Sequence, residues 1–490
     1  MVFTRFFFNM TVQDEFERPQ LQKGIGKAGM FSLAFGAMIG VGWITAMGAW
    51  LSNAGPLGAI IAFALGGLLM LAIGLCYAEV TAALPLSGGE VAYAYKAYGT
   101  SKAFIVGWFL VFGYLSVSAF EAISISKVIS YLIPSIDYWQ LYAVNGSPIY
   151  LSHIALSAFF VVVISAINYT GVKNAARFQV GLTVLFISLT FIFVIAGMVM
   201  GDWNNLSPLF STNHSGSIAA GIAMVLVTVP FWFVGFDTIP QAAEEANETI
   251  SAKTIGLLIP ISIMAAVCFY MLLIMSTSIA APWHEIISDK LPTAKAFGIA
   301  TESPFLVKLI LVTAIVGLLT SWNGFFLAGS RVLFAMGRGK IIAPVLGKSH
   351  LNYQTPYKAV LFSGVVTFLA SLMGPGAMIS FVNVGSLCIV IAFFGVSSSF
   401  LTLRKKFPNL HRPYTAPGGR LLGYVGMVGS LGILLLMVVP GSPVALVWPF
   451  EWGIFLTFSV LGLLFWLFAA KSRDRVPKKE RDYLVLEKFV

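Results

Sequence analysis

Three glycines, Gly36, Gly40 and Gly42, interrupt the first long apolar segment where a membrane-spanning helix should be most regular. Each glycine in a helix interior costs about 1 kcal/mol relative to alanine. In hydrocarbon, a broken helix also frees backbone N–H and C=O groups that no water can satisfy. Such a break is stable where a cavity with a polar ligand takes up those groups. The backbone here is therefore predicted to bind a polar solute, through Met38, Ile39, Gly40, Val41 and Gly42.

A second interruption occurs between Val229 and Asp237, where Pro230 and Gly235 flank a run of aromatic residues. Two broken helices in corresponding halves of a chain indicate the central site of a transporter. For one break alone, tight packing of small residues against a neighbouring helix is the alternative. We expect the second break to contribute Phe231, Trp232, Phe233 and Gly235 to the binding site.

Four polar residues in or beside apolar segments are candidates for coupling or gating: Glu121, Asp237, Lys127 and Asn323. A carboxylate deep in a membrane is costly and by default marks a pathway or relay. For Glu121 the alternative is a protonated structural acid. Lys127 can instead reach the interface with its long side chain. Asn323 can instead make an interhelical hydrogen bond.

The elements that carry these residues are predicted from composition. Hydrophobic residues make up 58% of the 490 positions and charged residues 10%, whereas soluble domains have about 25% charged residues. The chain contains about twelve runs near the roughly 20-residue length of a transmembrane helix. We expect spans at 29–52, 56–82, 103–133, 150–170, 176–200, 217–240, 253–281, 304–336, 358–374, 377–403, 421–440 and 449–470. The sequence thus predicts an all-α polytopic membrane protein.

The basic residues indicate orientation. With the N-terminus inside, 26 of the 30 Lys and Arg residues lie on the inner side, and only Lys290, Lys295 and Lys308 lie outside. This follows the positive-inside rule, so the net charge of +10 reflects topology and contact with anionic lipid headgroups rather than nucleic acid. Both termini are expected in the cytoplasm, and the plasma (inner) membrane is the expected location. The acidic run at Glu244, Glu245 and Glu248 is interpreted as a solvated inner face, or as a gate with Arg331 or Arg338.

The two breaks begin five-span blocks, which fits an inverted repeat with two appended helices. The predicted organisation is an N-terminal arm (1–28), a first repeat (29–200), a second repeat (217–403), two further helices (421–470) and a basic tail (471–490).

At these residues the chain resembles the amino acid–polyamine–organocation superfamily of permeases. The family pattern Gly-x-x-Ile-Gly-Ser-Gly-Ile-Phe corresponds to the stretch from Gly36 to Ile44, and the aromatic run with Gly-Phe-(Asp/Glu) to Phe231–Asp237. An Ala-Glu-Glu stretch and an Asn-Gly…Ser-Arg pattern follow in the same order, at Ala243-Glu244-Glu245, Asn323-Gly324 and Ser330-Arg331.

The resemblance implies a leucine-transporter-like five-plus-five fold, alternating access, and binding of an amino acid at the two breaks, with Phe231 as a gate over the substrate. Two departures are expected to alter the pocket. Val41 replaces a serine whose hydroxyl would bond the carboxylate, and Trp43, bulkier than the usual isoleucine, is expected to narrow or reshape the pocket.

The predicted function is secondary active transport of an amino acid or related amine, by proton or sodium symport or by exchange. A polyamine or organic-amine permease or antiporter is the alternative. A channel or a non-transporting sensor is less favoured, because two aromatic-rich breaks suit occlusion better than a continuous pore. The sequence has neither a His-Glu-x-x-His nor a Gly-x-Ser-x-Gly pattern, which disfavours an intramembrane enzyme. No cofactor or metal is expected.

Overall fold

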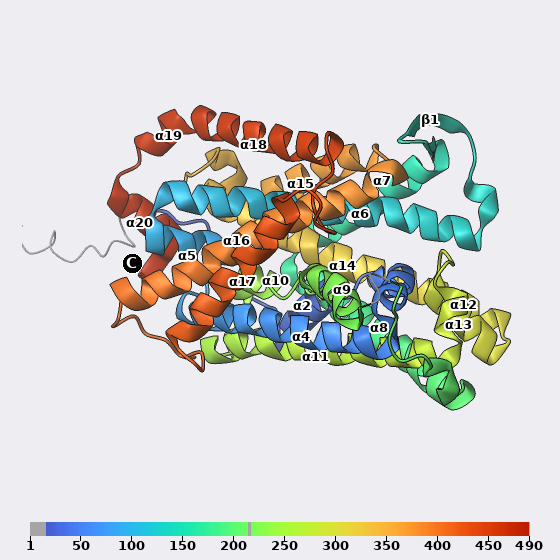
Figure 1. Ribbon diagram of the computed structural model, residues 1–490. Helices are drawn as coiled ribbons and strands as arrows, with labels where there is room; N and C mark the ends of the chain where they lie inside the picture. Colours follow the sequence, from blue (N-terminus) through green and yellow to red (C-terminus); the bar gives the residue numbers. More distant parts are fainter. Residues whose placement is uncertain (1–15, 214–216, 490) are drawn as a thin grey trace, which may run out of the picture.

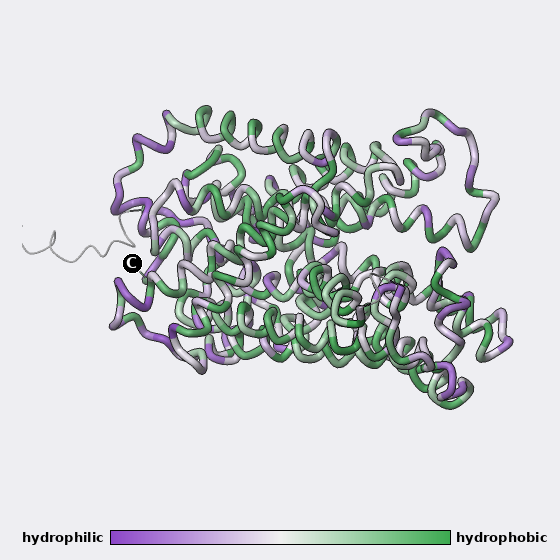
Figure 2. Tube along the Cα trace, in the orientation of Figure 1, coloured by the Kyte–Doolittle hydropathy of each residue, from purple (hydrophilic) through white to green (hydrophobic). Residues whose placement is uncertain are grey.

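The computed structural model describes residues 16–213 and 217–489, and the first fifteen residues of the predicted N-terminal arm lie outside the described part. Long helices run side by side in one bundle (Figure 1). Hydrophilic residues gather at its two ends, with hydrophobic residues between them (Figure 2). Within the described residues, ten helices are long and apolar enough to cross a membrane, and two shorter apolar helices, Ile218–Trp232 and Tyr357–Ser371, accompany them. The predicted all-α polytopic membrane protein is confirmed.

The helices of the first half closely follow the predicted spans, and the first predicted span is broken as expected. Their bounds are α2 (Lys27–Met38), α3 (Gly42–Thr45), α4 (Met47–Ala83), α5 (Gly89–Tyr98), α6 (Thr100–Leu132), α7 (Leu151–Tyr169) and α8 (Val172–Met200). The long α4 contains a sharp bend at Gly55, whose φ of 71° is costly for residues with a side chain. Gly55 therefore separates the end of the first predicted span from the second.

The second half again begins with a broken helix. Its bounds are α9 (Ile218–Trp232), α10 (Thr238–Ala242), α11 (Ala252–Ala280), α14 (Pro304–Arg338), α15 (Tyr357–Ser371), α16 (Met378–Lys406), α17 (Arg420–Val438) and α18 (Phe450–Phe468). Serine caps begin three of these helices, because the hydroxyls of Ser217, Ser251 and Ser303 accept hydrogen bonds from free backbone N–H groups in the first turn.

Shorter elements connect the long helices. The segment between α6 and α7 forms a two-stranded antiparallel hairpin, β1 (Gln140–Val144) and β2 (Ser147–Tyr150), which the sequence analysis did not predict. The remaining short helices are η1 (Pro134–Ile136), η2 (Trp203–Leu206), η3 (Ala243–Glu245), α12 (Trp283–Ile286), α13 (Pro292–Thr301), η4 (Pro344–Gly347), η5 (Pro375–Ala377), α19 (Ala470–Asp474), α20 (Lys478–Leu486) and η6 (Glu487–Phe489).

The two ends of the bundle differ. One end, here called the terminal face, holds α5, α20 and the segment 16–26, while β1, α12 and α13 lie at the opposite face (Figure 1). From its sequence, the amphipathic segment with Tyr93, Tyr95, Lys96 and Tyr98 is expected to lie along the membrane interface. That prediction is wrong for its core, because Tyr93 is fully buried in α5 and Tyr95 is 7% exposed. The tail packs beneath it, since the Tyr95 hydroxyl donates to Asp482 of α20 at 2.7 Å.

Burial singles out the helices that position the site. In the most apolar stretch of α6, 78% of residues are buried, and the broken first span reaches 72%. In α18 only 11% are buried, as expected for a helix whose apolar surface faces lipid. The first broken span and α6 therefore lie at the centre of the bundle.

Candidate functional site

The first break covers Ile39, Gly40 and Val41, between the end of α2 and the start of α3. Among the described residues, no backbone acceptor is recorded for the N–H groups of Gly40, Val41 and Gly42. Gly42 is needed at this position because a Cβ there would lie 2.2 Å from the Trp232 ring. The predicted break is confirmed, with N–H groups available at the start of α3.

The second break runs from Phe233 to Asp237, between α9 and α10. Gly235 has a φ of 132°, which side chains rarely permit, and a Cβ there would lie 2.6 Å from the Met38 backbone nitrogen. The two breaks therefore contact each other directly. Gly235 contributes by permitting this approach rather than by lining a cavity.

Tyr270 of α11 joins the two breaks. Its hydroxyl lies 3.0 Å from the Met38 carbonyl oxygen and 3.2 Å from the Trp232 carbonyl oxygen, as donor to both. Each carbonyl lies at the end of a helix segment that stops at the break, so neither continues the regular helical pattern. Sequence reasoning missed Tyr270. A hydroxyl-bearing residue inside an apolar span is the signal that could have identified it.

A cavity of about 220 Å³ lies beside the two breaks. Its lining includes most of the predicted binding residues, while Ile39, Phe233 and Gly235 are packed outside it. The lining residues are Ala37, Met38, Gly40, Val41, Gly42, Thr45, Val117, Phe120, Glu121, Phe231, Trp232, Val234, Tyr270, Ser321, Phe325, Ile379 and Val382. Most of these side chains are apolar, and Glu121 is the one charged member of the set.

Glu121 reaches the cavity from α6 and is 2% exposed. It lies against the first break, because a Cβ on Gly40 would be 3.2 Å from Glu121 Oε1. The Ser321 hydroxyl of α14 hydrogen-bonds to this carboxyl group, and Glu121 Oε2 has no partner among the described residues. A buried carboxyl oxygen without a donor is available to a proton or to a cationic group of a ligand.

The exposed part of the cavity lining lies toward the opposite face. It includes Thr45, which follows the first break, and Ile379 at the start of α16, which is 73% exposed. Thr45 follows α2, which begins at the terminal face, and Ile379 begins α16, which ends at that face. Both residues therefore lie on the side of the breaks toward the opposite face.

Asp237 lies behind the cavity rather than in its lining. It is fully buried, and it accepts hydrogen bonds from the Gly235 N–H at 2.9 Å and from the Tyr114 hydroxyl at 2.7 Å. The Gln241 side-chain amide donates to Glu90 of α5 and lies 3.4 Å from the Tyr114 hydroxyl. Asp237 thus belongs to a buried polar chain that runs from the second break toward α5.

The other two coupling candidates lie away from the cavity. Asn323 is fully buried and joins neighbouring helices, donating to Gln179 at 2.7 Å and accepting from Asn168 at 2.9 Å. This arrangement favours the interhelical hydrogen bond. Lys127 is exposed, which fits a side chain that reaches the interface.

Trp43 does not narrow the cavity as we predicted. Its side chain is fully buried and outside the lining, with its ring 6.2 Å from that of Phe186 in an edge-to-face arrangement. The large side chain packs into the surrounding bundle, and the volume of the cavity is therefore set by other residues.

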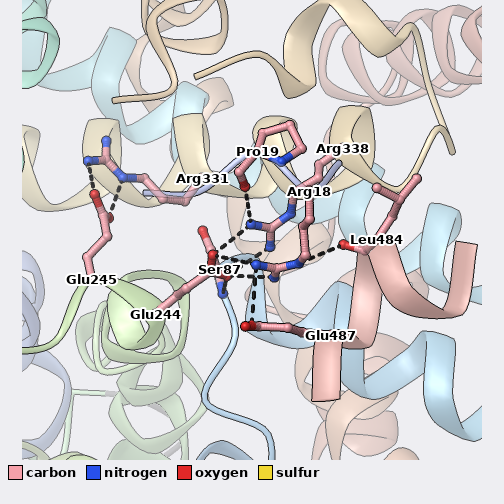
Figure 3. A network of polar contacts seen from close by, with 9 residues as sticks. All are labelled: Arg18, Pro19, Ser87, Glu244, Glu245, Arg331, Arg338, Leu484 and Glu487. Atoms are coloured by element: carbon pink, nitrogen blue, oxygen red, sulfur yellow. Dashed lines mark hydrogen bonds and ion pairs between the residues drawn. The ribbon is translucent and has the colours of Figure 1, made fainter. Parts of the chain in front are cut away.

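An ion-pair cluster lies at the terminal face, and Figure 3 shows its contacts. Glu244 accepts from both terminal nitrogens of Arg338, at 2.7 and 2.8 Å, and from those of Arg18, at 3.1 Å each. Next to it, Glu245 pairs with Arg331 at 2.8 Å, and both side chains are fully buried. The interpretation of this acidic run as a solvated face is wrong for Glu244 and Glu245, and the predicted pairing with Arg331 and Arg338 is confirmed.

Electrostatics keep Glu244 ionised. Burial alone raises the pKa of Glu244, but the charges of Arg338 and Arg18 lower it more, so that its pKa lies well below the usual value. The Ser87 backbone N–H adds a further hydrogen bond at 3.0 Å. Both ends of the chain take part, because Arg18 also contacts Glu487 at 3.3 Å and the Leu484 carbonyl oxygen at 3.3 Å.

Known membrane transport proteins are similar to this chain over most of its length. A family model for amino acid permeases matches residues 25–471. The branched-chain amino acid permease BcaP of Bacillus subtilis (strain 168) is 27% identical over 421 residues, 85% of this chain and 88% of that protein. The methylthioribose transporter of the same organism is 26% identical over 390 residues, 79% of this chain and 82% of that protein. The aspartate-proton symporter of Bacillus subtilis (strain 168) is 24% identical over 421 residues, 83% of this chain and 78% of that protein. This chain belongs to the amino acid permease family, as its sequence motifs indicated.

Proposed function

We propose that this protein is a secondary active transporter that moves an α-amino acid with an apolar side chain across the membrane by alternating access. The observation that carries the proposal is the pair of broken helices whose free backbone groups lie beside one largely apolar cavity. Membership in a permease family supports transport in preference to catalysis, and the names of BcaP and of the aspartate-proton symporter support an amino acid as the solute.

The backbone suits the two charged groups of an amino acid. Free N–H groups at Gly40, Val41 and Gly42, at the start of a helix segment, attract a carboxylate. Carbonyl groups of the second break attract an ammonium. No lysine or arginine belongs to the cavity lining, so the backbone takes the role that a basic side chain fills in many carboxylate sites.

The apolar lining favours an apolar side chain on the solute. Val117, Phe120, Phe325 and Val382 face the cavity from α6, α14 and α16, and Phe231 takes the place of the gate that the family resemblance implies. A polyamine carries several cations but would meet only one carboxylate, that of Glu121. The alternative function, a polyamine or organic-amine permease or antiporter, is therefore less favoured.

Glu121 is the proposed carrier of a coupling proton. Its unpartnered oxygen lies in the cavity, where arrival of a proton removes a buried charge. Proton coupling in one relative, the aspartate-proton symporter, supports this assignment. Sodium coupling is the alternative, and an uptake measurement with separate ion gradients distinguishes the two.

The proposed orientation places the terminal face in the cytoplasm of a cell whose plasma membrane contains the protein. Lys and Arg residues concentrate in the segments that meet at this face, as the positive-inside rule requires. In this orientation the cavity is accessible from outside, and the Glu244 cluster closes the inner route. We further propose that 29–200 and 217–403 are the two inverted repeats, since each begins with a broken helix.

The test is uptake of radiolabelled apolar amino acids into liposomes that contain purified protein. An inward proton gradient should drive accumulation in the wild type. Glu121→Gln should abolish gradient-driven accumulation and leave exchange of internal for external amino acid, because binding does not require the proton. Glu285→Gln, a change at an exposed carboxylate, is the matched control and should retain both activities.

Three results would contradict the proposal. Equal gradient-driven accumulation by Glu121→Gln and wild type would exclude Glu121 as the carrier. Unitary currents in a planar bilayer would indicate a channel. Binding of an amino acid without any flux would indicate a sensor.

A further inference from the structure

Glu90 of α5 is a fully buried carboxyl group that the proposed transport cycle does not use. It lies in the first turn of α5, outside the candidate membrane spans. The tyrosine-rich residues that follow it are expected at the membrane interface, where a carboxylate would be hydrated. Its burial needs another explanation.

The partners of Glu90 are polar but neutral. The Gln241 amide of α10 donates to Glu90 Oε2, and the Tyr77 hydroxyl of α4 lies near the carboxyl group without a recorded hydrogen bond to it. No ion pair to Glu90 is recorded among the described residues, although every other buried glutamate at this end, Glu79, Glu244 and Glu245, pairs with an arginine. A buried carboxylate without a cation is strongly disfavoured relative to the neutral acid.

The charged groups on the helices packed against α5 do not compensate a negative charge on Glu90. From α14, Arg331 is already paired with Glu245, and from α16, Arg404 is paired with Glu79. Lys406 donates to the Ala97 carbonyl oxygen, and α20 presents Asp482 to Tyr95. From α6, Tyr114 donates its hydroxyl to Asp237. The start of α5 favours an anion through its free N–H groups, but by less than burial disfavours it.

Unpaired atoms in the same cluster indicate where a proton would lie. Among the described residues, Glu90 Oε1, Gln241 Oε1 and the Tyr77 hydroxyl oxygen have no hydrogen-bond partner. A proton on Glu90 Oε1 converts that oxygen into a donor, and the other two atoms are acceptors. Burial raises the pKa of Glu90 well above its usual value, and the nearby charge of Asp237 raises it further.

The Glu90 cluster also joins two parts of the bundle across the second break. Asp237 and Gln241 belong to the segment that leads into the Glu244 cluster, whereas Glu90 and Tyr114 belong to α5 and α6. Ser87, whose N–H bonds to Glu244, lies three positions before Glu90 in the chain. A movement of α10 away from α5 and α6 would separate the bonds from Gln241 to Glu90 and from Tyr114 to Asp237, and would admit water to Glu90.

We propose that Glu90 is a second proton-binding site of this transporter, distinct from Glu121, that holds a proton while the terminal face is closed. On opening, the O–H bond of the acid breaks, the proton passes to water at that face, and a hydrated carboxylate remains. Closing reverses the step. The link to solute flux rests on the proposed function, whereas protonation of Glu90 does not.

Infrared spectroscopy of the purified protein tests the protonation itself. The band of a neutral carboxylic acid should be present near neutral pH in the wild type and should persist in Glu121→Gln. Glu90→Gln, which has the shape of the neutral acid, should lose a discrete part of this band. Glu79→Gln is the matched control and should leave the band unchanged, because Glu79 is a buried carboxylate paired with both Arg404 and Arg412. Absence of an acid band in Glu121→Gln, or an unchanged band in Glu90→Gln, would overturn the proposal, whatever the outcome of the uptake assay.

Cysteine labelling tests the coupling to opening. With the native cysteines replaced, Ser87→Cys reports opening because Ser87 is 2% exposed, and Ser251→Cys at an exposed position corrects for thiol ionisation. The ratio of the two labelling rates should rise with pH from about 6 to about 8, by up to about tenfold per pH unit, the limit for release of one proton. The same ratio should be flat with pH in Glu90→Gln. A pH-dependent ratio that Glu90→Gln preserves would overturn the coupling.

Discussion

Removal of the Glu244 charge should open the terminal face. In Glu244→Gln, the Arg18 and Arg338 guanidiniums lose the carboxylate that binds both of them. Loss of one partner from a buried ion pair costs about 3–5 kcal/mol. We expect the lower end of this range, because Glu487 at 3.3 Å still compensates Arg18. A loss of about 3 kcal/mol corresponds to roughly a hundredfold change in an equilibrium constant.

The assay is labelling of Ser87→Cys by a membrane-impermeant maleimide. The ion pairs stabilise the closed form, so their loss should increase the labelling rate by up to about a hundredfold. Glu248→Gln is the matched control four residues along the chain. Glu248 pairs with Lys23 at 3.3 Å, but the two side chains are 79% and 55% exposed, and exposed pairs contribute at most about 1 kcal/mol. Equal labelling of the two variants would refute the assignment of Glu244 as the closing residue.

The pH dependence of this cluster has a defined sign. Because the pKa of Glu244 is lowered in the folded protein, its contribution to stability is fully present above about pH 4.5, the ordinary value, and is lost as the pH falls below it. Unfolding of the wild type in detergent should therefore become easier below about pH 4.5, and Glu244→Gln should remove part of this acid sensitivity. An unchanged acid sensitivity would contradict the assignment.

Two further substitutions test the contact between the broken helices. Gly42→Ala places a Cβ 2.2 Å from the Trp232 ring, and such overpacking costs about 1–3 kcal/mol. Binding of the amino acid in a thermal-shift assay should weaken accordingly, whereas Gly432→Ala, with no atom within 4 Å of the new methyl group, should bind normally. Tyr270→Phe leaves two buried carbonyl groups without a donor and should lower the free energy of unfolding by about 1–3 kcal/mol. Tyr424→Phe, at a side chain that is 52% exposed, should change it by less than about 0.5 kcal/mol. Equal effects within either pair would contradict the role given to that contact.

The breaks and spans were predictable because they follow from local sequence. Glycines and a proline in otherwise apolar segments weaken a helix wherever it lies, so the interruptions near Gly40 and Gly235 could be located without tertiary contacts. The length of each apolar run likewise marks a membrane span. Even the pairing of the acidic run with Arg331 and Arg338 could be suggested, since opposite charges meet at the same end of the bundle.

Other features depend on contacts between distant segments. A glutamate beside tyrosines and a lysine would be expected at the membrane interface, and only the packing of α5 against α6, α10 and α16 buries Glu90. Tyr270 is an ordinary residue of an apolar span until the fold places its hydroxyl between two helix ends. Trp43 is expected in the cavity from the sequence because it follows Gly42. The side chain instead packs outside the cavity, because the helical conformation of α3 sets the direction in which it points. The participation of Arg18 and Glu487 in one cluster joins the two ends of the chain, which no local pattern indicates.

The central claim is that both charged groups of an amino acid complete the backbone of the two broken helices. The most direct measurement compares how three ligands stabilise the purified protein: an apolar L-amino acid, the amine that lacks its carboxylate, and the acid that lacks its amine. At about 100 times its dissociation constant, the amino acid should stabilise the protein by about 2.7 kcal/mol, and neither analogue should do so at the same concentration. Equal stabilisation by either analogue would contradict the claim.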